Sequence, residues 1–142
     1  MFAKQLTVFI ENRTGRLCEV LNVLKDNNVN ILSLSLADTT EFGLLRLIVD
    51  NPALGKEKLS EGGFSSLLSN VSIIEIPHTS GSLQKLLKTI DDNGVNIEYM
   101  YGLSIESNAA YVVLKASDSE KVDAILAENG INTLDNEALA HL

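Results

Sequence analysis

The stretch Asp26-Asn27-Asn28-Val29-Asn30-Ile31 decides the fold, because it returns as Asp92-Asn93-Gly94-Val95-Asn96-Ile97 with five of its six residues unchanged. The same spacing of 66 residues relates Gly15 to Gly81 and Leu24 to Ile90, and it also relates Leu17 to Leu83 and Leu21 to Leu87. One register that holds through a turn, a helix and a strand indicates an internal duplication. The chain is therefore predicted to contain two copies of one small fold, residues 1–69 and residues 70–142.

Hydrophobic patterning predicts the same order of elements in both copies. Apolar residues recur at helical spacing in two segments, and the segments beside them alternate as strands do. In the first copy we expect, in order, a strand over 6–11, a helix carrying Leu17–Leu24, strands over 31–36 and 42–49, a helix from Asn51 to Gly63, and a strand over 64–70. In the second copy we expect a strand over 71–76, a helix carrying Leu83–Ile90, strands over 97–105 and 109–116, a helix between Ser117 and Gly130, and a strand over 131–134.

Glycine and short polar residues are expected to set the ends of these elements. Asp26-Asn27-Asn28 should end the first helix, because Asn tolerates the left-handed conformation of a helix C-terminus. Ser117, Asp118 or Ser119 should cap the last long helix, whereas Gly55 predicts a weak helix after Asn51. Each copy thus reads βαββαβ. This order predicts an α+β, ferredoxin-like sandwich, in which one four-stranded antiparallel sheet carries two helices on one face.

Charge and composition exclude several classes of partner. The net charge is −8, of which −7 falls within residues 70–142, and neither copy has a basic cluster. Nucleic acid and anionic membranes are therefore not expected as partners. The single cysteine, Cys18, excludes an internal disulfide. The N-terminal apolar stretch ends at Glu11 and is too short for a signal sequence or a membrane span, so a cytoplasmic protein is expected.

Residues suited to catalysis or to cofactor binding do not cluster in the sequence. Cys18 and His78 belong to different copies, and His141 lies beside the C-terminus, so no metal site is expected. Glycine-rich phosphate-binding motifs are absent from the sequence. A small enzyme would need acid–base groups gathered in one cleft, and the sequence indicates none. We expect no enzymatic activity, no metal and no cofactor.

The turn after the first strand of each copy is the best candidate for a binding site. Backbone N–H groups at a helix N-terminus are unpaired and favour an anion such as a carboxylate. Gly15 would let a ligand approach closely, and Asn12 offers both a donor and an acceptor to an amino acid. The candidate ligand-binding residues here are Asn12, Arg13, Thr14, Gly15, Arg16 and Leu17 in the first copy, and His78, Thr79, Ser80, Gly81, Ser82 and Leu83 in the second. Each also has a structural interpretation, as helix cap, turn former or solvated surface.

Asn30 and Asn96 form a second candidate group, with Ile31 and Ile97 beside them. Asn is a poor strand residue, yet it stands at the start of the second strand in both copies. Two interpretations stay open. The side chain bonds local backbone in a repeated turn, or it points into a cleft opposite the strand–helix turn of the neighbouring copy.

These residues resemble the ACT domain family. Glu11-Asn12-Arg13-Thr14-Gly15-Arg16-Leu17, followed by Asn28-Val29-Asn30-Ile31, is similar to the Asn-Arg-Pro-Gly-x-Leu and Gly-Val-Asn-Ile pattern of that family. The resemblance covers the whole chain as two tandem domains. It implies modules that bind small ligands, usually amino acids, at domain–domain interfaces and regulate enzymes of amino-acid metabolism. The serine-binding ACT module of phosphoglycerate dehydrogenase has asparagines at the positions of Asn12 and Asn30. The resemblance therefore implies ligand contact for these two residues and for Asn96.

The sequence also departs from the family pattern. Thr14 replaces the usual proline, and Ile10 stands where the serine-binding module has a ligand-binding histidine, so serine itself is not implied. In the second copy Pro77, His78 and Thr79 replace the Glu-Asn-Arg of the first. The two copies are accordingly free to bind differently.

Together these observations predict a stand-alone amino-acid-binding regulator with its ligand between the repeats. Small domains with open sheet edges also make a homodimer the expected assembly. The alternative is a regulatory subunit that acts mainly by contact with an enzyme of amino-acid metabolism. The stretch Asn30-Ile31-Leu32-Ser33-Leu34 supports that alternative, because it resembles the regulatory subunit of acetolactate synthase.

Overall fold

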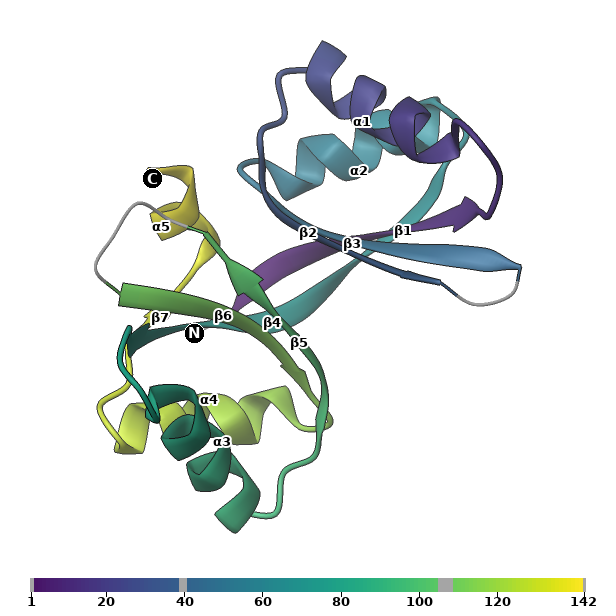
Figure 1. The fold of residues 1–142 in the computed structure, drawn as a ribbon. Coiled ribbons are helices and arrows are strands. Elements are labelled where there is room, and N and C mark those ends of the chain that lie inside the picture. The colour runs from purple at the N-terminus through teal and green to yellow at the C-terminus, as the bar shows by residue number, and fades with distance from the viewer. Residues whose placement is uncertain (1, 39–40, 105–108, 142) are drawn as a thin grey trace. The chain divides into compact units, whose positions relative to one another are not determined.

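The computed structural model of the protein describes residues 2–38, 41–104 and 109–141, and these form two compact units (Figure 1). The first unit is Lys4–Ser69, and the second unit contains the remaining described residues. Thr39 and Thr40 of the predicted hairpin turn, and Ile105 at the end of a predicted strand, lie outside the described residues.

The first unit has the predicted order of elements. It comprises β1 (Ala3–Glu11), α1 (Arg16–Asp26), β2 (Ile31–Asp38), β3 (Phe42–Val49), α2 (Pro52–Glu61) and the beginning of β4 (Ser65–Pro77). The strand order is β2-β3-β1-β4, and β3 pairs antiparallel with both of its neighbours. The central position predicted for residues 42–49 is thus confirmed. Both helices cover one face of this sheet (Figure 1).

The second unit repeats this arrangement with the rest of β4. It continues with α3 (Ser82–Asp92), β5 (Ile97–Leu103), β6 (Ala109–Ala116), α4 (Ser119–Glu128), β7 (Thr133–Leu134) and α5 (Asn136–Ala140). The strand order is β7-β4-β6-β5, and every one of these pairs is antiparallel. The α+β class and the βαββαβ repeat predicted from the sequence are therefore confirmed.

Each unit has its own hydrophobic core at positions that the duplication relates. Val8, Val20 and Leu24 are fully buried in the first unit, where the alternation of β1 and the helical spacing of α1 place them. Their counterparts in the second unit, Ile74, Leu86 and Ile90, are buried in the same way. Burial of such a side chain contributes about 1.5–3 kcal/mol, so the two sandwiches rest on equivalent apolar contacts.

Asparagine ends the helices as the sequence predicts. Asn28 adopts the left-handed conformation, with φ of 58°, just beyond α1. The preceding Asn27 donates from Nδ2 to the carbonyl of Val23 at 2.8 Å. Asn93 and Asn129 make the same bond, also at 2.8 Å, at the ends of α3 and α4. These bonds satisfy carbonyl groups that the helix leaves without a partner.

Two features of the fold differ from the prediction. The strands expected over 64–70 and 71–76 form one continuous strand, β4, because no glycine or proline interrupts the chain before Pro77. The strand expected over 131–134 is reduced to Thr133–Leu134, and the short helix α5 follows. The side chain of Asp135 caps α5 by accepting a hydrogen bond from the N–H of Ala138 at 2.8 Å.

Gly55 has a packing role that its low helix propensity conceals. It is buried inside α2, which runs for ten residues and is not interrupted there. A Cβ atom at this position would lie 3.1 Å from Leu6 Cδ2 and 3.5 Å from Leu24 Cδ2. Glycine therefore lets α2 pack closely against β1 and α1, and tertiary packing outweighs the helix-propensity cost of about 1 kcal/mol.

Candidate functional site

The helices that follow the first strand of each unit begin without a side-chain cap. At α1 and α3 no side chain accepts a hydrogen bond from the first turn. By contrast, the side chains of Asn51, Asp118 and Asp135 cap α2, α4 and α5. The role of helix cap considered for Thr14, Ser80 and Ser82 is therefore not observed. Arg16 N and Ser82 N donate to the carbonyls of Arg13 and Thr79 at 3.4 Å and 3.2 Å, so an external anion would bind the N–H groups that follow them in the first turn.

Gly15 and Gly81 precede these two helices in the left-handed conformation, with φ of 89° and 86°. An added Cβ atom would meet nothing within 4 Å at either position. The backbone conformation alone thus explains both glycines. The same geometry leaves open space beside each turn.

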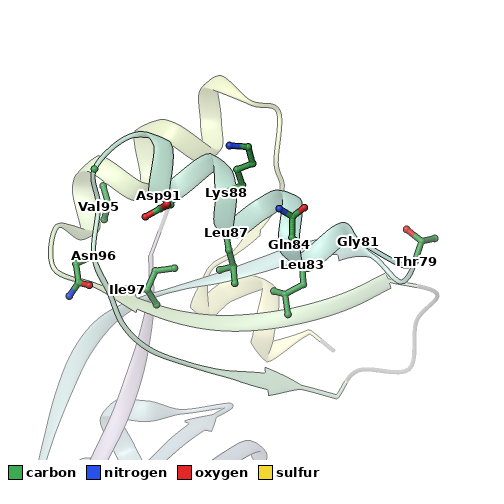
Figure 2. Close-up of a pocket in the computed structure, with 11 residues that line it drawn as sticks. Thr79, Gly81, Leu83, Gln84, Leu87, Lys88, Asp91, Val95, Asn96 and Ile97 are labelled. Atoms are coloured by element: carbon green, nitrogen blue, oxygen red, sulfur yellow. The ribbon is translucent and has the colours of Figure 1, made fainter.

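A groove of about 1040 Å³ runs between α3 and β5 in the second unit (Figure 2). We call it the α3–β5 groove. Five residues that the sequence predicted as ligand-binding line it: Thr79, Gly81, Leu83, Asn96 and Ile97. Six further residues complete the lining: Gln84, Leu87, Lys88, Asp91, Gly94 and Val95. The strand–helix turn and the start of the second strand of one copy therefore line opposite ends of a single groove (Figure 2).

The floor of the α3–β5 groove is apolar. Leu83 and Leu87 project from α3 toward β5, and Ile97 projects from the start of β5 toward them (Figure 2). Gln84 and Lys88 project away from that strand (Figure 2). Lys88 is also engaged by the carboxylate of Asp92, with Nζ 3.2 Å from Oδ2. The charged groups of α3 thus lie at the rim of the groove rather than on its floor.

Asn96 and its counterpart Asn30 are held by their backbone groups and keep exposed side chains. The carbonyl of Asn96 accepts from Ser117 N at 3.0 Å, and that of Asn30 accepts from Asp50 N at 3.1 Å. In these turns the side chains that bond local backbone carbonyls are those of Asn27 and Asn93, rather than those of Asn30 and Asn96. Each copy also has a strand irregularity one step further on, between Ile31 and Ser33 or between Ile97 and Tyr99. Such bulges are frequent beside functional sites.

A second hollow, of about 1100 Å³, borders the same turn. Thr79, Ser80, Gly81 and Ser82 contribute to it, together with residues 129–132 after α4. The hydroxyls of Thr79 and Ser82 lie 2.7 Å apart and hydrogen-bond to each other. His78, which was also predicted as a ligand-binding residue, lines neither space.

The turn of the first unit is built differently. Arg16 ion-pairs with Glu19, with Nη1 2.6 Å from Oε2, and its guanidinium lies 4.4 Å from the ring centroid of Phe64. Arg13 pairs with Glu11 at the surface, with Nε 3.0 Å from Oε2. Asn12 and Thr14 are exposed. The cationic side chains of this turn are therefore engaged by neighbours of the same unit.

Six lining residues were not predicted from the sequence: Gly94 and Val95 in the turn before β5, and Gln84, Leu87, Lys88 and Asp91 on α3. Leu87 was detectable, because it lies one helical turn after Leu83 and repeats Leu21 of the first copy. The other three on α3 are exposed polar residues. Their position beside the groove depends on how close α3 lies to β5, which periodicity does not report.

The family model for the ACT domain pair matches residues 1–142. The chain therefore belongs to the ACT domain pair family. No curated protein matches the sequence. Within the described residues, no helix is long and apolar enough to cross a membrane.

Solved structures share this fold. The crystal structure of protein BT0572 from Bacteroides thetaiotaomicron is 37% identical in sequence, with a TM-score of 0.93 over 100% of this chain and 98% of that one. The regulatory subunit of aspartate kinase from Thermus thermophilus, in a ligand-free form, is 15% identical, with a TM-score of 0.63 over 88% and 90%. The same subunit from Thermus flavus is 16% identical, with a TM-score of 0.59 over 89% and 90%. At these lower identities the similarity is one of fold alone.

Proposed function

We propose that this protein is an amino-acid-binding regulator without catalytic activity, and that the α3–β5 groove holds the ligand. The observation that carries the proposal is the uncapped first turn of α3, which opens onto a groove shared with Asn96. A free amino acid presents a carboxylate and an ammonium group close together. The helix N-terminus suits the carboxylate, whereas Asn96 lies at the opposite end of the groove, beyond Asp91 (Figure 2).

The fold shared with known regulatory proteins also supports the proposal. The regulatory subunits of aspartate kinase from Thermus thermophilus and Thermus flavus share this fold. We propose by analogy that ligand binding here alters the contact of this protein with an enzyme of amino-acid metabolism. A ligand position between the repeats, as expected from the sequence, stays a prediction. Gly15, Leu17 and Ile31 are the counterparts of Gly81, Leu83 and Ile97 and extend the proposal to the first copy.

A thermal-shift panel of the twenty standard amino acids at millimolar concentration tests the proposal. A ligand that binds only the folded state, at about 100 times its Kd, adds about 2.7 kcal/mol to the free energy of unfolding. For a chain of this size the melting temperature should rise by roughly 5–10 °C. A panel in which no amino acid raises the melting temperature would contradict the proposal.

The position of the site is tested by Gln84→Glu, which places a carboxylate on the first turn of α3, in the lining of the groove. Repulsion between this carboxylate and that of the ligand should weaken binding of the active amino acid about tenfold. Glu98→Gln is the control, because it changes the charge by one unit at an exposed residue that does not line the groove. Equal affinities in wild type and in both variants would place the ligand elsewhere in the protein.

The second candidate function is regulation by protein contact alone. Five large apolar side chains are exposed in the described part of the first unit: Phe9, Leu34, Leu36, Phe42 and Leu67. Exposed apolar side chains mark an interaction site where they form one contiguous patch. A stable complex with an enzyme in pull-down experiments, unchanged by any amino acid, would favour this function. Light scattering of the isolated chain reports whether the chain forms a homodimer before it meets an enzyme.

A further inference from the structure

The floor of the α3–β5 groove narrows the chemical class of ligand. Among the described residues of the second unit, Leu83 is the one large apolar side chain that stays exposed, at 41% of its surface. It points into the groove with Leu87 and Ile97 (Figure 2). An apolar side chain left open to water at the floor of a groove loses that contact with water when a ligand covers it.

Polar and charged groups are not available on this floor. The nearest cation, Lys88, is paired with Asp92 and projects away from β5. Asp91 is eight residues beyond Leu83, about 12 Å along the helix axis, so an amino acid held at the first turn does not reach it. A polar ligand side chain laid on the floor would lose water without gaining a hydrogen bond, which is unfavourable.

The duplication keeps the same three side chains in the other copy. Leu17, Leu21 and Ile31 stand at the positions of Leu83, Leu87 and Ile97. The rim residues, by contrast, have changed: Gln84, Lys88 and Asp91 correspond to Cys18, Asn22 and Lys25. The apolar floor is thus the shared element of the two copies, and the rim is the variable one.

We propose that the α3–β5 groove selects amino acids with an aliphatic side chain of two or more carbons. This proposal rests on the amino-acid binding proposed above. The carboxylate lies at the first turn of α3, and the aliphatic side chain covers Leu83, Leu87 and Ile97. Leu83 itself belongs to that first turn, and Leu87 is four residues further, about 6 Å along the axis. A short aliphatic chain therefore spans the floor.

A homologous series titrated into the full chain by calorimetry tests the inference. The ligands are alanine, 2-aminobutyrate, norvaline and norleucine, with serine, aspartate and lysine as polar comparators. Each added methylene that becomes buried should lower Kd about fourfold. Serine, aspartate or lysine binding more tightly than norvaline, or no dependence on chain length, would overturn the inference and leave the proposed function standing. Binding of no amino acid at all would overturn both.

A pair of leucine variants ties the selectivity to the floor. Leu83→Ala should raise the Kd of norvaline about fivefold to twentyfold and flatten the dependence on chain length, with little change for alanine. Leu67→Ala is the control, since Leu67 is 40% exposed on β4 of the first unit and does not line the groove. Both leucines are partly exposed, so the melting temperatures without ligand should stay within a few degrees of wild type. An unchanged norvaline affinity in Leu83→Ala contradicts the inference.

Discussion

The two copies share one core and differ at the turn before their first helix. In the first copy Arg16 is held by Glu19 and by the ring of Phe64. In the second copy the same position is Ser82. The spacing is 67 residues after the second helix, where Phe64 N bonds the Leu59 carbonyl and Ile131 N bonds the Leu126 carbonyl, so Ile131 takes the position of Phe64. A hollow of about 1100 Å³ borders both Ser82 and Ile131. The comparison teaches that duplication preserved the scaffold while side chains at one turn were exchanged. The second copy thereby gained open space where the first has a fixed guanidinium.

The largest expected effect tests the shared part of this comparison. Leu24→Ala and Ile90→Ala truncate fully buried side chains at duplicated positions of α1 and α3. Each should lower the free energy of unfolding by about 2–5 kcal/mol, because a cavity replaces the lost side chain. Urea denaturation followed by circular dichroism measures both values. A near-zero effect in one copy alone would break the claim that the two cores are equivalent.

The glycines of the two turns should respond alike. Gly15→Ala and Gly81→Ala both place a Cβ on a left-handed residue that has open space around it. Backbone strain should therefore cost about 1–2 kcal/mol at each position, without any added clash. The midpoint of urea unfolding is the readout. Effects that differ between the copies by more than about 1 kcal/mol would show that the two turns are not conformationally equivalent.

Removing a side chain that caps a helix should cost more stability than removing one that does not. Asp118→Ala removes the side chain that accepts from Lys121 N at 3.1 Å and should cost about 1 kcal/mol. Ser82→Ala removes a hydroxyl that bonds only Thr79 in the described structure and should stay within about 0.5 kcal/mol. Thermal unfolding without ligand gives both values. An equal loss in Ser82→Ala would mean that α3 is capped after all.

The smallest effect concerns the arginines of the first turn. Arg16→Ala loses a partly buried ion pair and a contact with an aromatic ring, for about 0.5–1 kcal/mol. Arg13→Ala loses only a solvent-exposed pair with Glu11 and should be close to neutral. Comparing the unfolding midpoint of each variant with that of wild type resolves the difference. Equal effects would contradict the structural role assigned to Arg16.

Much of the fold was predictable because it depends on local patterns. The repeated Asp-Asn-x-Val-Asn-Ile stretch and the spacing of Leu17, Val20, Leu21 and Leu24 predicted two βαββαβ copies. The continuous strand β4 was not predicted, since the sequence signal there was the boundary between two copies rather than a turn residue. Gly55 was interpreted as weakening α2, because its contacts with Leu6 and Leu24 come from distant parts of the chain.

The candidate site was predictable only in part for the same reason. Gly81, Leu83 and Asn96 were identified from turn chemistry and repetition, and the groove includes all three. Lys88 and Asp91 look like ordinary solvated residues of an amphipathic helix. The groove beside them exists because α3 and β5 are joined by a short turn at Gly94 and are held apart by side chains, which is a property of the packed unit.

The most direct test of the account is a nuclear magnetic resonance titration of the isotope-labelled full chain with norvaline. Binding at the α3–β5 groove predicts the largest amide shifts at Gly81, Leu83, Gln84, Asn96 and Ile97, saturating with one affinity. Amide shifts confined to residues outside that groove, or no saturable shift, would contradict the claim that this groove is an amino-acid site.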